Sequence, residues 1–372
     1  MPSLPGGGVI GCATAYFLTR HPKYDRTLHK ITLLEATAIA SGASGKAGGL
    51  LGLWAYPQEL VPLSFRLHQQ LATEHDGATQ WGYRRLACGS ISAVVKEADL
   101  PKAVKASPHG PAHGNAANGG SNGSAPLPMQ SQAGTDEGKA WEKLPKQDDA
   151  ASRLLKDSPL PPDLDWIKGS LVQQYQEMGR PGFTETAQVH PYRFTTAIAA
   201  LAADRGADIR MGAKVTAIRH ASGGGVTGVD YLERRTNATK SMDNVTDVVV
   251  SAGPWTGVLL PRSRVEGLRA HSVVWEADVS AYAVFTDIQL PASYVPEHRQ
   301  KQKQARKHKR NVDPEIYARP GGEVYACGKI KSFPIRPAPS LTTTPSPCSP
   351  FFQPTVPALR HNPFLPSLLG YF

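Results

Sequence analysis

Apolar positions recur at helical spacing in three parts of the chain. The segment from Cys12 to His21 has helical composition and stops before a proline, and Leu63, Leu67 and Leu71 fall on one helical face. A stripe of apolar residues over 191–205 begins at a proline and is followed by a glycine, which predicts a helix there. Short apolar runs predict strands at 31–35, 214–218, 226–232 and 247–251. The pattern predicts a mixed α/β chain.

Three stretches interrupt this pattern. Residues 108–135 contain no Lys, Arg, Asp or Glu but six Gly and four Pro, so we expect a low-complexity insertion over 104–140. Between Arg299 and Arg310, seven of twelve residues are Lys or Arg, and we interpret 298–311 as a second, basic insertion. From residue 330 to the end, ten of 43 residues are Pro. Because each Pro lacks a backbone donor and has a fixed φ, we expect a disordered tail over 329–372.

Composition narrows the class of protein. With 372 residues, 40% of them hydrophobic, the chain can form two domains, and no apolar run is long enough to span a membrane. The start of the chain lacks a secretion leader, and the four Cys form no CxxC pair, so we expect a reducing, cytoplasmic location and no metal site. The net charge of +10 comes mostly from the basic run, which no aromatic residue interrupts. A solvated loop is favoured there over a nucleic-acid site.

The start of the chain carries a phosphate-binding pattern. Gly6, Gly8 and Gly11 satisfy G-x-G-x-x-G, a helix follows, and Glu35 ends the next strand 24 positions after Gly11. In such a site the glycines allow a tight turn and close approach of a pyrophosphate, and the acid binds ribose hydroxyls. The motif also requires a strand before the glycines, and only MPSLP precedes them. These five residues, two of them Pro, predict that the first strand is absent.

Two segments at the start of the chain carry a family resemblance. The stretches GGGVIGCATAYFL and LLEATAIASGASGKAGGLL resemble the FAD-dependent oxidases of D-amino acids, glycine and sarcosine. Matches continue downstream at 188–192, 206–209, 212–218, 249–255 and 316–325. The resemblance, strongest to fungal FAD oxidoreductases, covers residues 6–328 outside the insertions. It implies a Rossmann-like FAD-binding domain joined to a substrate domain with a mixed sheet.

The resemblance implies a division of the chain. The FAD-binding domain would use 1–95 and return over 215–260, and the substrate domain would use 141–214, with the helix at 191–205, and 261–328. It also assigns the cofactor site. The residues implied to hold FAD are Gly6, Gly8, Val9, Ile10, Gly11, Glu35, Ala36, Ser41, Ser44, Lys46, Gly49, Leu50, Val215, Ala252, Gly253 and Trp255.

The resemblance further implies hydride transfer from a small amine or amino-acid-like substrate to the flavin, with oxygen as acceptor. Arg319 is the candidate for holding a substrate carboxylate, and Tyr317 for shaping the pocket. A surface hairpin pair is the alternative for both. His190 is expected to cap the following helix rather than to act in the site. Cys327 is expected to be a small buried residue rather than a flavin attachment point.

Two alternatives to an active enzyme stay open. The family's C-terminal segment is expected to be missing after Gly328, which together with the absent first strand suggests a truncated gene product. Such a product would be inactive. Alternatively, the protein would keep the fold without catalysis and act in endosomal trafficking, since a yeast relative of the resembling fungal group is linked to endosomal sorting.

Overall fold

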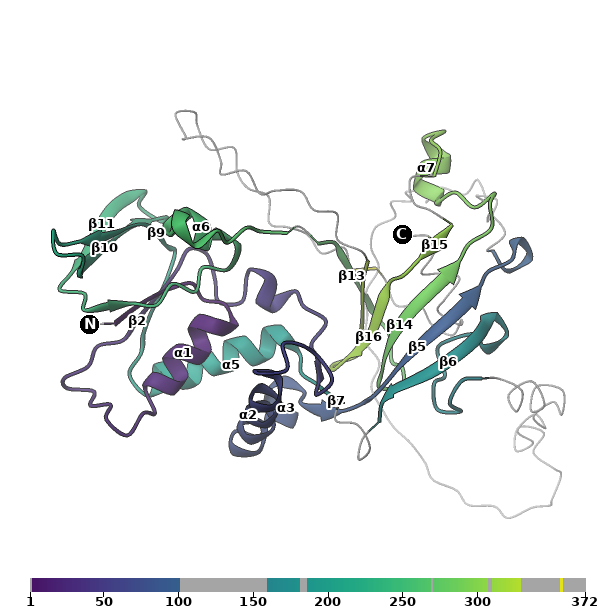
Figure 1. The fold of residues 1–372 in the computed structure, drawn as a ribbon, viewed down its shortest axis with the longest axis horizontal. Coiled ribbons are helices and arrows are strands. Elements are labelled where there is room, and N and C mark those ends of the chain that lie inside the picture. The colour runs from purple at the N-terminus through teal and green to yellow at the C-terminus, as the bar shows by residue number, and fades with distance from the viewer. Residues whose placement is uncertain are drawn as a thin grey trace, which may run out of the picture.

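The computed structural model describes residues 2–100, 159–180, 186–268, 270–306, 310–328 and 355–356. These residues form a mixed α/β fold with four sheets. Figure 1 shows a parallel sheet with its helices at one end of the molecule and a large mixed sheet at the other. The predicted insertion at 104–140 lies outside the described residues.

The parallel sheet has the strand order β12-β1-β2-β8. Helices α1 (Val9–Leu18) and α5 (Pro191–Asp204) pack together beside it (Figure 1). Their small residues, such as Ala15 and Ala199, allow close approach and are buried in one core with Leu4 and Leu33. The strands are β1 (Pro2–Pro5), β2 (Thr32–Glu35), β8 (Asp208–Met211) and β12 (Asp247–Val248).

The prediction that the first strand is absent is wrong. Residues Pro2–Pro5 form β1, which lies between β2 and β12 and pairs in parallel with both. A proline lacks only the donor of a strand residue and keeps the acceptor. The carbonyl of Pro5 accepts a hydrogen bond from the Ser251 amide at 2.9 Å, and the Ser3 carbonyl accepts one from Val249 at 3.0 Å. Four residues with two prolines are therefore enough for a central strand here.

The large mixed sheet has eight strands in the order β18-β13-β17-β16-β14-β5-β6, with β15 paired to β14. Side chains alternate between its two faces. One face carries the largest core cluster, which includes Trp166, Trp275 and Val284. The other face carries a smaller cluster with Tyr317 and Tyr325. The strands are β5 (Ala87–Val94), β6 (Val172–Gly179), β13 (Ser272–Glu276), β14 (Tyr282–Gln289), β15 (Asn311–Val312), β16 (Glu315–Arg319), β17 (Glu323–Cys327) and β18 (Thr355–Val356).

Two three-stranded sheets and four further helices complete the described structure. One sheet, in the order β11-β10-β9, contains β9 (Ala213–His220), β10 (Val226–Glu233) and β11 (Ala238–Asp243). The other, β3-β7-β4, contains β3 (Leu50–Gly52), β4 (Arg84–Arg85) and β7 (Thr186–Gln188). The helices are α2 (Val61–Glu74), α3 (Gly77–Trp81), α6 (Thr256–Leu259) and α7 (Glu297–Lys301).

Three sequence expectations are corrected by this arrangement. The helix over 191–205 and the strand after it were assigned to the substrate domain, but α5 packs on α1 and β8 pairs with β2. Periodicity predicts a helix without saying which sheet it covers. Within the predicted tail, β18 pairs with β13, so that tail is not wholly without structure, and its other residues lie outside the described part. In the basic insertion, α7 is helical, and 307–309 are not described.

Candidate cofactor and substrate site

The turn between β1 and α1 can be made only with glycine at two positions. Gly6 has a φ of +120°, and a Cβ there would lie 2.3 Å from the Ser251 carbonyl oxygen. A Cβ on Gly11 would lie 1.9 Å from the Gly6 carbonyl oxygen. The glycines therefore allow helix α1 to start directly against the strand ends. The first turn of α1 stays accessible, with Ile10 64% exposed.

Glu35 lies at the end of β2, beside this turn. Its Oε2 accepts a hydrogen bond from the Gly7 amide at 2.7 Å, and its Oε1 accepts one from the Thr37 amide at 2.8 Å. The next residue, Ala36, accepts a bond from the Arg234 guanidinium through its carbonyl at 3.4 Å. Val215 on β9 packs in the same small cluster as Leu34 of β2. The predicted ribose acid and the predicted adenine strand are thus neighbours.

The segment Ser41–Leu50, called the wrap below, crosses the start of α1. Ser44 Oγ accepts a hydrogen bond from the Val9 amide at 2.9 Å, and it lies 2.9 Å from the point where a Cβ of Gly8 would be. Ser41 Oγ lies 2.6 Å from Thr37 Oγ1, and Lys46 is exposed. Gly49 has a φ of +85°, which a residue with a side chain rarely adopts. The wrap and the turn together form a backbone-lined surface.

The segment after β12 closes the other side of the turn. Ser251 Oγ donates to the carbonyls of Pro5 and Gly6 at 3.0 and 3.2 Å. Ala252 and Gly253 follow in a tight turn that leads into Trp255. The indole of Trp255 is 56% exposed, and its nearest ring carbon would lie 3.9 Å from a Cβ on Gly42 of the wrap. The structure therefore brings all four predicted cofactor segments to one place.

Strands β16 and β17 carry three side-chain pairs on one face, called the stripe below. The register places Glu315 opposite Cys327, Tyr317 opposite Tyr325 and Arg319 opposite Glu323. The wrap rests on the middle pair, because a Cβ on Gly48 would lie 2.1 Å from Tyr317 Cδ2. The cofactor segments and the large sheet meet at this contact.

Arg319 is buried, at 5% exposure, so it is not half of a surface hairpin pair. Its Nη1 lies 3.5 Å from Glu323 Oε2, and its Nη2 lies 3.4 Å from His190 Nε2. Burial lowers the pKa of the Arg319 guanidinium. The hydrogen bond from His190 lowers the pKa of the Glu323 carboxyl group. His190 also caps α5, as expected, by accepting from the Arg193 amide at 3.5 Å. Within the described part of the chain, Arg319 Nε has no hydrogen-bond partner.

Tyr317 is also buried, and its ring stacks on Tyr325 with centroids 6.0 Å apart. Its hydroxyl donates to Glu315 Oε2. Burial raises the pKa of Tyr317 well above its ordinary value, and the hydrogen bond to Glu315 raises it further. Tyr317 is therefore a neutral hydrogen-bond donor throughout the ordinary pH range.

Comparison with known proteins identifies the family. The profile described as "DAO: FAD dependent oxidoreductase" matches residues 6–341. The match extends beyond Gly328, the residue at which the sequence resemblance was expected to end. This chain belongs to the FAD-dependent oxidoreductase family. It is 34% identical to the oxidoreductase TDA3 of Saccharomyces cerevisiae over 397 residues, covering 87% of this chain and 72% of that protein.

Two further matches agree with this membership. The oxidoreductase C1F5.03c of Schizosaccharomyces pombe is 28% identical over 345 residues, covering 89% of this chain and 70% of that protein. The crystal structure of glycine oxidase from Bacillus cereus has a similar fold, with a TM-score of 0.52 and 20% identity, covering 89% of this chain and 73% of the other. The family is FAD-dependent, so FAD is the cofactor to test against the site.

The residues at the β1–α1 turn fit FAD. A pyrophosphate needs close approach to the backbone at a helix N-terminus, and the glycines leave the start of α1 without side chains at Gly6, Gly7 and Gly8. The Gly7 and Val9 amides are already bonded to Glu35 and Ser44, which fixes the two segments beside the turn. A ribose needs an acceptor beside that turn, and Glu35 lies there. The turn between β1 and α1, the end of β2 and the wrap, called the cradle below, therefore fit this cofactor.

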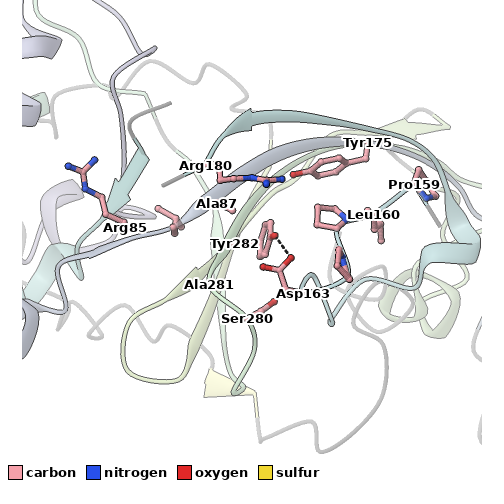
Figure 2. A pocket seen from close by; sticks show the side chains of 13 residues that line it. Arg85, Ala87, Pro159, Leu160, Asp163, Tyr175, Arg180, Ser280, Ala281 and Tyr282 are labelled. Atoms are coloured by element: carbon pink, nitrogen blue, oxygen red, sulfur yellow. Dashed lines mark hydrogen bonds between the residues drawn. The ribbon is translucent and has the colours of Figure 1, made fainter. Parts of the chain in front are cut away.

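A cavity of about 650 Å³ lies elsewhere in the molecule (Figure 2). Its walls come from the start of β5, from β6, and from the segments around Leu160 and Ser280, and Tyr282 donates to Asp163 at 2.7 Å inside it. Tyr282 and Leu160 belong to the core on the sheet face opposite Tyr317. None of the predicted site residues lines this cavity.

Two searches of the described residues complete the site description. No helix among them combines the length and apolar character that crossing a bilayer requires. Nor do they contain a group of three or more His, Cys, Asp or Glu side chains placed to hold a metal ion.

Several residues of the stripe were missed by the sequence reasoning. Glu315, Glu323 and Tyr325 occupy alternate positions around the predicted Tyr317 and Arg319, on strands that alternate apolar and polar side chains. Strand periodicity could have found them as members of the same face. The link between Arg319 and His190 spans 129 residues, and no local signal shows it.

Proposed function

We propose that this protein oxidises an amine or amino-acid-like substrate by hydride transfer to FAD, with oxygen as the final acceptor. When bound, FAD supplies the hydride acceptor that no amino-acid side chain provides. A C–H bond next to the neutral amine nitrogen breaks, the hydride leaves with both electrons, and the nitrogen lone pair forms the C=N bond of an iminium ion, which loses a proton to water to give the imine. The chain's own residues bind the substrate, orient it and exclude water.

The cradle residues carry the cofactor part of this proposal. The backbone of Gly6 and Gly8 and the amide of Ile10 would face the pyrophosphate, and Glu35 and Ala36 would face the ribose. Gly11 would let α1 lie close to β1, and the Val9 amide, bonded to Ser44 Oγ, would hold the wrap beside the cofactor. The wrap would enclose the remainder, and Val215 and the turn after β12 the adenine side. The residues assigned to these last two roles are Ser41, Ser44, Lys46, Gly49 and Leu50 of the wrap, and Val215, Ala252, Gly253 and Trp255.

One observation supports the catalytic part: the wrap rests on the stripe at Gly48 and Tyr317. A cofactor held by the wrap would lie beside the face that carries Tyr317 and Arg319. Tyr317 would shape the pocket with its ring, because its hydroxyl donates to Glu315. Arg319 would hold a carboxylate, for which its unpartnered Nε offers a buried donor. Its ion pair with Glu323 is long at 3.5 Å, so a substrate carboxylate could replace Glu323 as the partner of the guanidinium.

The test uses purified full-length chain incubated with FAD. Flavin absorbance that stays with the protein through gel filtration shows binding. A panel of amines and amino acids is then added without oxygen, and loss of the oxidised flavin absorbance identifies substrates. Admission of oxygen should restore the absorbance and produce one equivalent of hydrogen peroxide. Retained flavin that no amine reduces would refute the proposed reaction and favour the non-catalytic alternative.

We further propose, from the sequence resemblance, that the protein works in the cytoplasm with an endosome-associated pool. A fluorescent tag on the full-length protein, imaged together with an endosomal marker, tests this location. A signal confined to another organelle would refute it.

A further inference from the structure

Glu315 is a carboxylate whose described neighbours carry no positive charge. It is half-buried at one end of the stripe, where Oε2 accepts from the Tyr317 hydroxyl and lies 3.9 Å from Cys327 Sγ. Both neighbours are neutral donors. Among the residues that the structure describes, no Lys, Arg or His forms an ion pair with Glu315, whereas Glu323 at the other end of the stripe is paired with Arg319. Removing a charge from water is unfavourable unless an opposite charge compensates.

The charge of Glu315 contributes to the raised pKa of three neighbours on this face, Tyr317, Cys88 and Cys327. Burial raises the pKa of Cys88 to about 12, and Glu315 contributes in the same direction. Burial also raises the pKa of Cys327, again with a contribution from Glu315. The surroundings therefore hold their protons and add no positive charge beside the carboxylate.

A row of aromatic rings begins beside this carboxylate at Phe285, its cross-strand partner on β14. The Trp54 and Phe285 rings meet edge to face with centroids 6.0 Å apart, and the Phe285 and Tyr317 rings do the same at 6.0 Å. Tyr325 continues the row by stacking on Tyr317. Aromatic faces attract organic cations, and several rings around one carboxylate are typical of alkylammonium recognition.

This end of the stripe is open to a ligand. Trp54 is 37% exposed, and Phe285, Glu315 and Cys327 are all half-buried, whereas Tyr317 is nearly fully buried. The wrap contacts Tyr317 and Tyr325 in the middle of the stripe, and Glu315 at its end is half-buried. A small cation can therefore reach Glu315 without displacing the core.

We propose that Glu315, with Trp54, Phe285 and Tyr317 around it, binds a positively charged alkylammonium group of the substrate. This inference rests on the proposed function, because it assigns the site to the substrate of that reaction. Glu315 and Arg319 lie at opposite ends of the stripe, four residues apart on one strand, or about 13 Å. An α-ammonium lies next to its carboxylate and cannot reach both. The group bound at Glu315 is therefore a second, distal cation, and the substrate class is an amine with a cationic side chain or a diamine.

The first test measures binding without turnover. Choline is the probe, and dimethylbutanol, in which carbon replaces the charged nitrogen, is its uncharged isostere. A quaternary nitrogen has no lone pair, so choline cannot lose a hydride next to nitrogen and form an imine. NMR titration of the full-length chain should show choline binding and much weaker binding of the isostere. Equal affinity for the two probes would overturn the proposal.

Glu315→Gln removes the charge and keeps a carbonyl oxygen that can accept from Tyr317. We expect it to weaken choline binding at least about tenfold, the loss of one charge-assisted contact. Glu297→Gln is the matched control, because Glu297 is an exposed carboxylate on α7 and its removal changes the net charge equally. Trp54→Leu is a second variant at a partly exposed ring, and it should reduce the preference for choline over the isostere. Unchanged choline affinity in both site variants would refute the site.

Turnover separates this proposal from the proposed function. If choline binds as described but no amine reduces the flavin, the reaction fails and the cation site stands. If amines are oxidised but Glu315→Gln leaves the KM for diamines and monoamines in the same ratio, the reaction stands and the cation site fails. The expected result is a rise of at least about tenfold in the KM for diamines, with little change for monoamines.

Discussion

Alanine substitutions at two glycines of the β1–α1 turn should have different effects, one on stability and the other on FAD affinity. A Cβ on Gly11 would lie 1.9 Å from a backbone oxygen and 2.7 Å from Ser251 Oγ, so the helix must move away from the strand. A Cβ on Gly8 would lie 2.9 Å from Ser44 Oγ and 3.8 Å from its Cβ, with no other atom within 4 Å. Gly8 has an extended backbone that alanine can adopt, with a φ of −81°.

The magnitudes follow from these contacts. Gly11→Ala gains about 1 kcal/mol of helix propensity but loses about 3 kcal/mol to overpacking, a net loss of about 2 kcal/mol in the free energy of unfolding. Gly8→Ala weakens the helix cap by at most about 1 kcal/mol. It places a methyl group where the pyrophosphate should approach, and we expect FAD affinity to fall at least about tenfold, or 1.4 kcal/mol.

Thermal unfolding and FAD titration measure both effects. Gly11→Ala should lower the Tm by roughly 4–8 °C, and Gly8→Ala should lower FAD affinity with a smaller Tm change. Gly223→Ala is the control, because a Cβ there meets nothing within 4 Å and its φ is outside the left-handed region. A Gly11→Ala protein as stable as the control would refute the packing argument. Normal FAD affinity in Gly8→Ala would refute the location of the pyrophosphate.

Three further predictions concern pH, charge pairing and the wrap. Burial lowers the pKa of His68 to about 4, so the unfolded chain takes up a proton that the folded protein excludes. Stability should fall by up to about 3 kcal/mol as the pH drops from about 6.5 to 4, and His68→Leu should reduce that fall in urea titrations. Arg319→Met leaves Glu323 without its cation and should cost about 2 kcal/mol at pH 7, with much of the loss recovered in the double variant with Glu323→Gln. Because the pKa of Glu323 is lowered, its stabilisation should be present above pH ~4.3 and disappear on acidification. Gly48→Ala should push the wrap away from Tyr317, lower FAD affinity and leave the secondary structure unchanged by circular dichroism; unaltered affinity would contradict the role of this contact.

The grouping of the cradle residues could be predicted because its signals are local. The spacing of Gly6, Gly8 and Gly11 and the position of Glu35 depend on one turn, one helix and one strand, and the structure places them together. The error at β1 came from treating proline as excluded from a central strand. Pro5 lies there because its carbonyl, rather than its missing amide, makes the required bond to the Ser251 segment.

The stripe could be predicted only in part, because it depends on register. Tyr317 and Arg319 were found on β16, but their partners on β17 are fixed by a hairpin whose alignment no residue pattern specifies. Helix α5 shows the same limit. Its apolar stripe predicted a helix with nearly the correct ends, whereas its packing on α1 follows from a contact between segments far apart in the sequence.

The contact between Gly48 and Tyr317 determines how the two halves of the site are related. There is no room for a side chain at Gly48, because the backbone of the wrap packs directly on the Tyr317 ring of the stripe. A cofactor held by the wrap and a substrate held by the stripe would therefore be neighbours. The two ends of the stripe differ in charge. Arg319 is enclosed with Glu323 and His190, whereas Glu315 is half-buried and none of the described Lys, Arg or His side chains pairs with it. Discrimination between amines would then depend on the open end of the stripe rather than on the cradle.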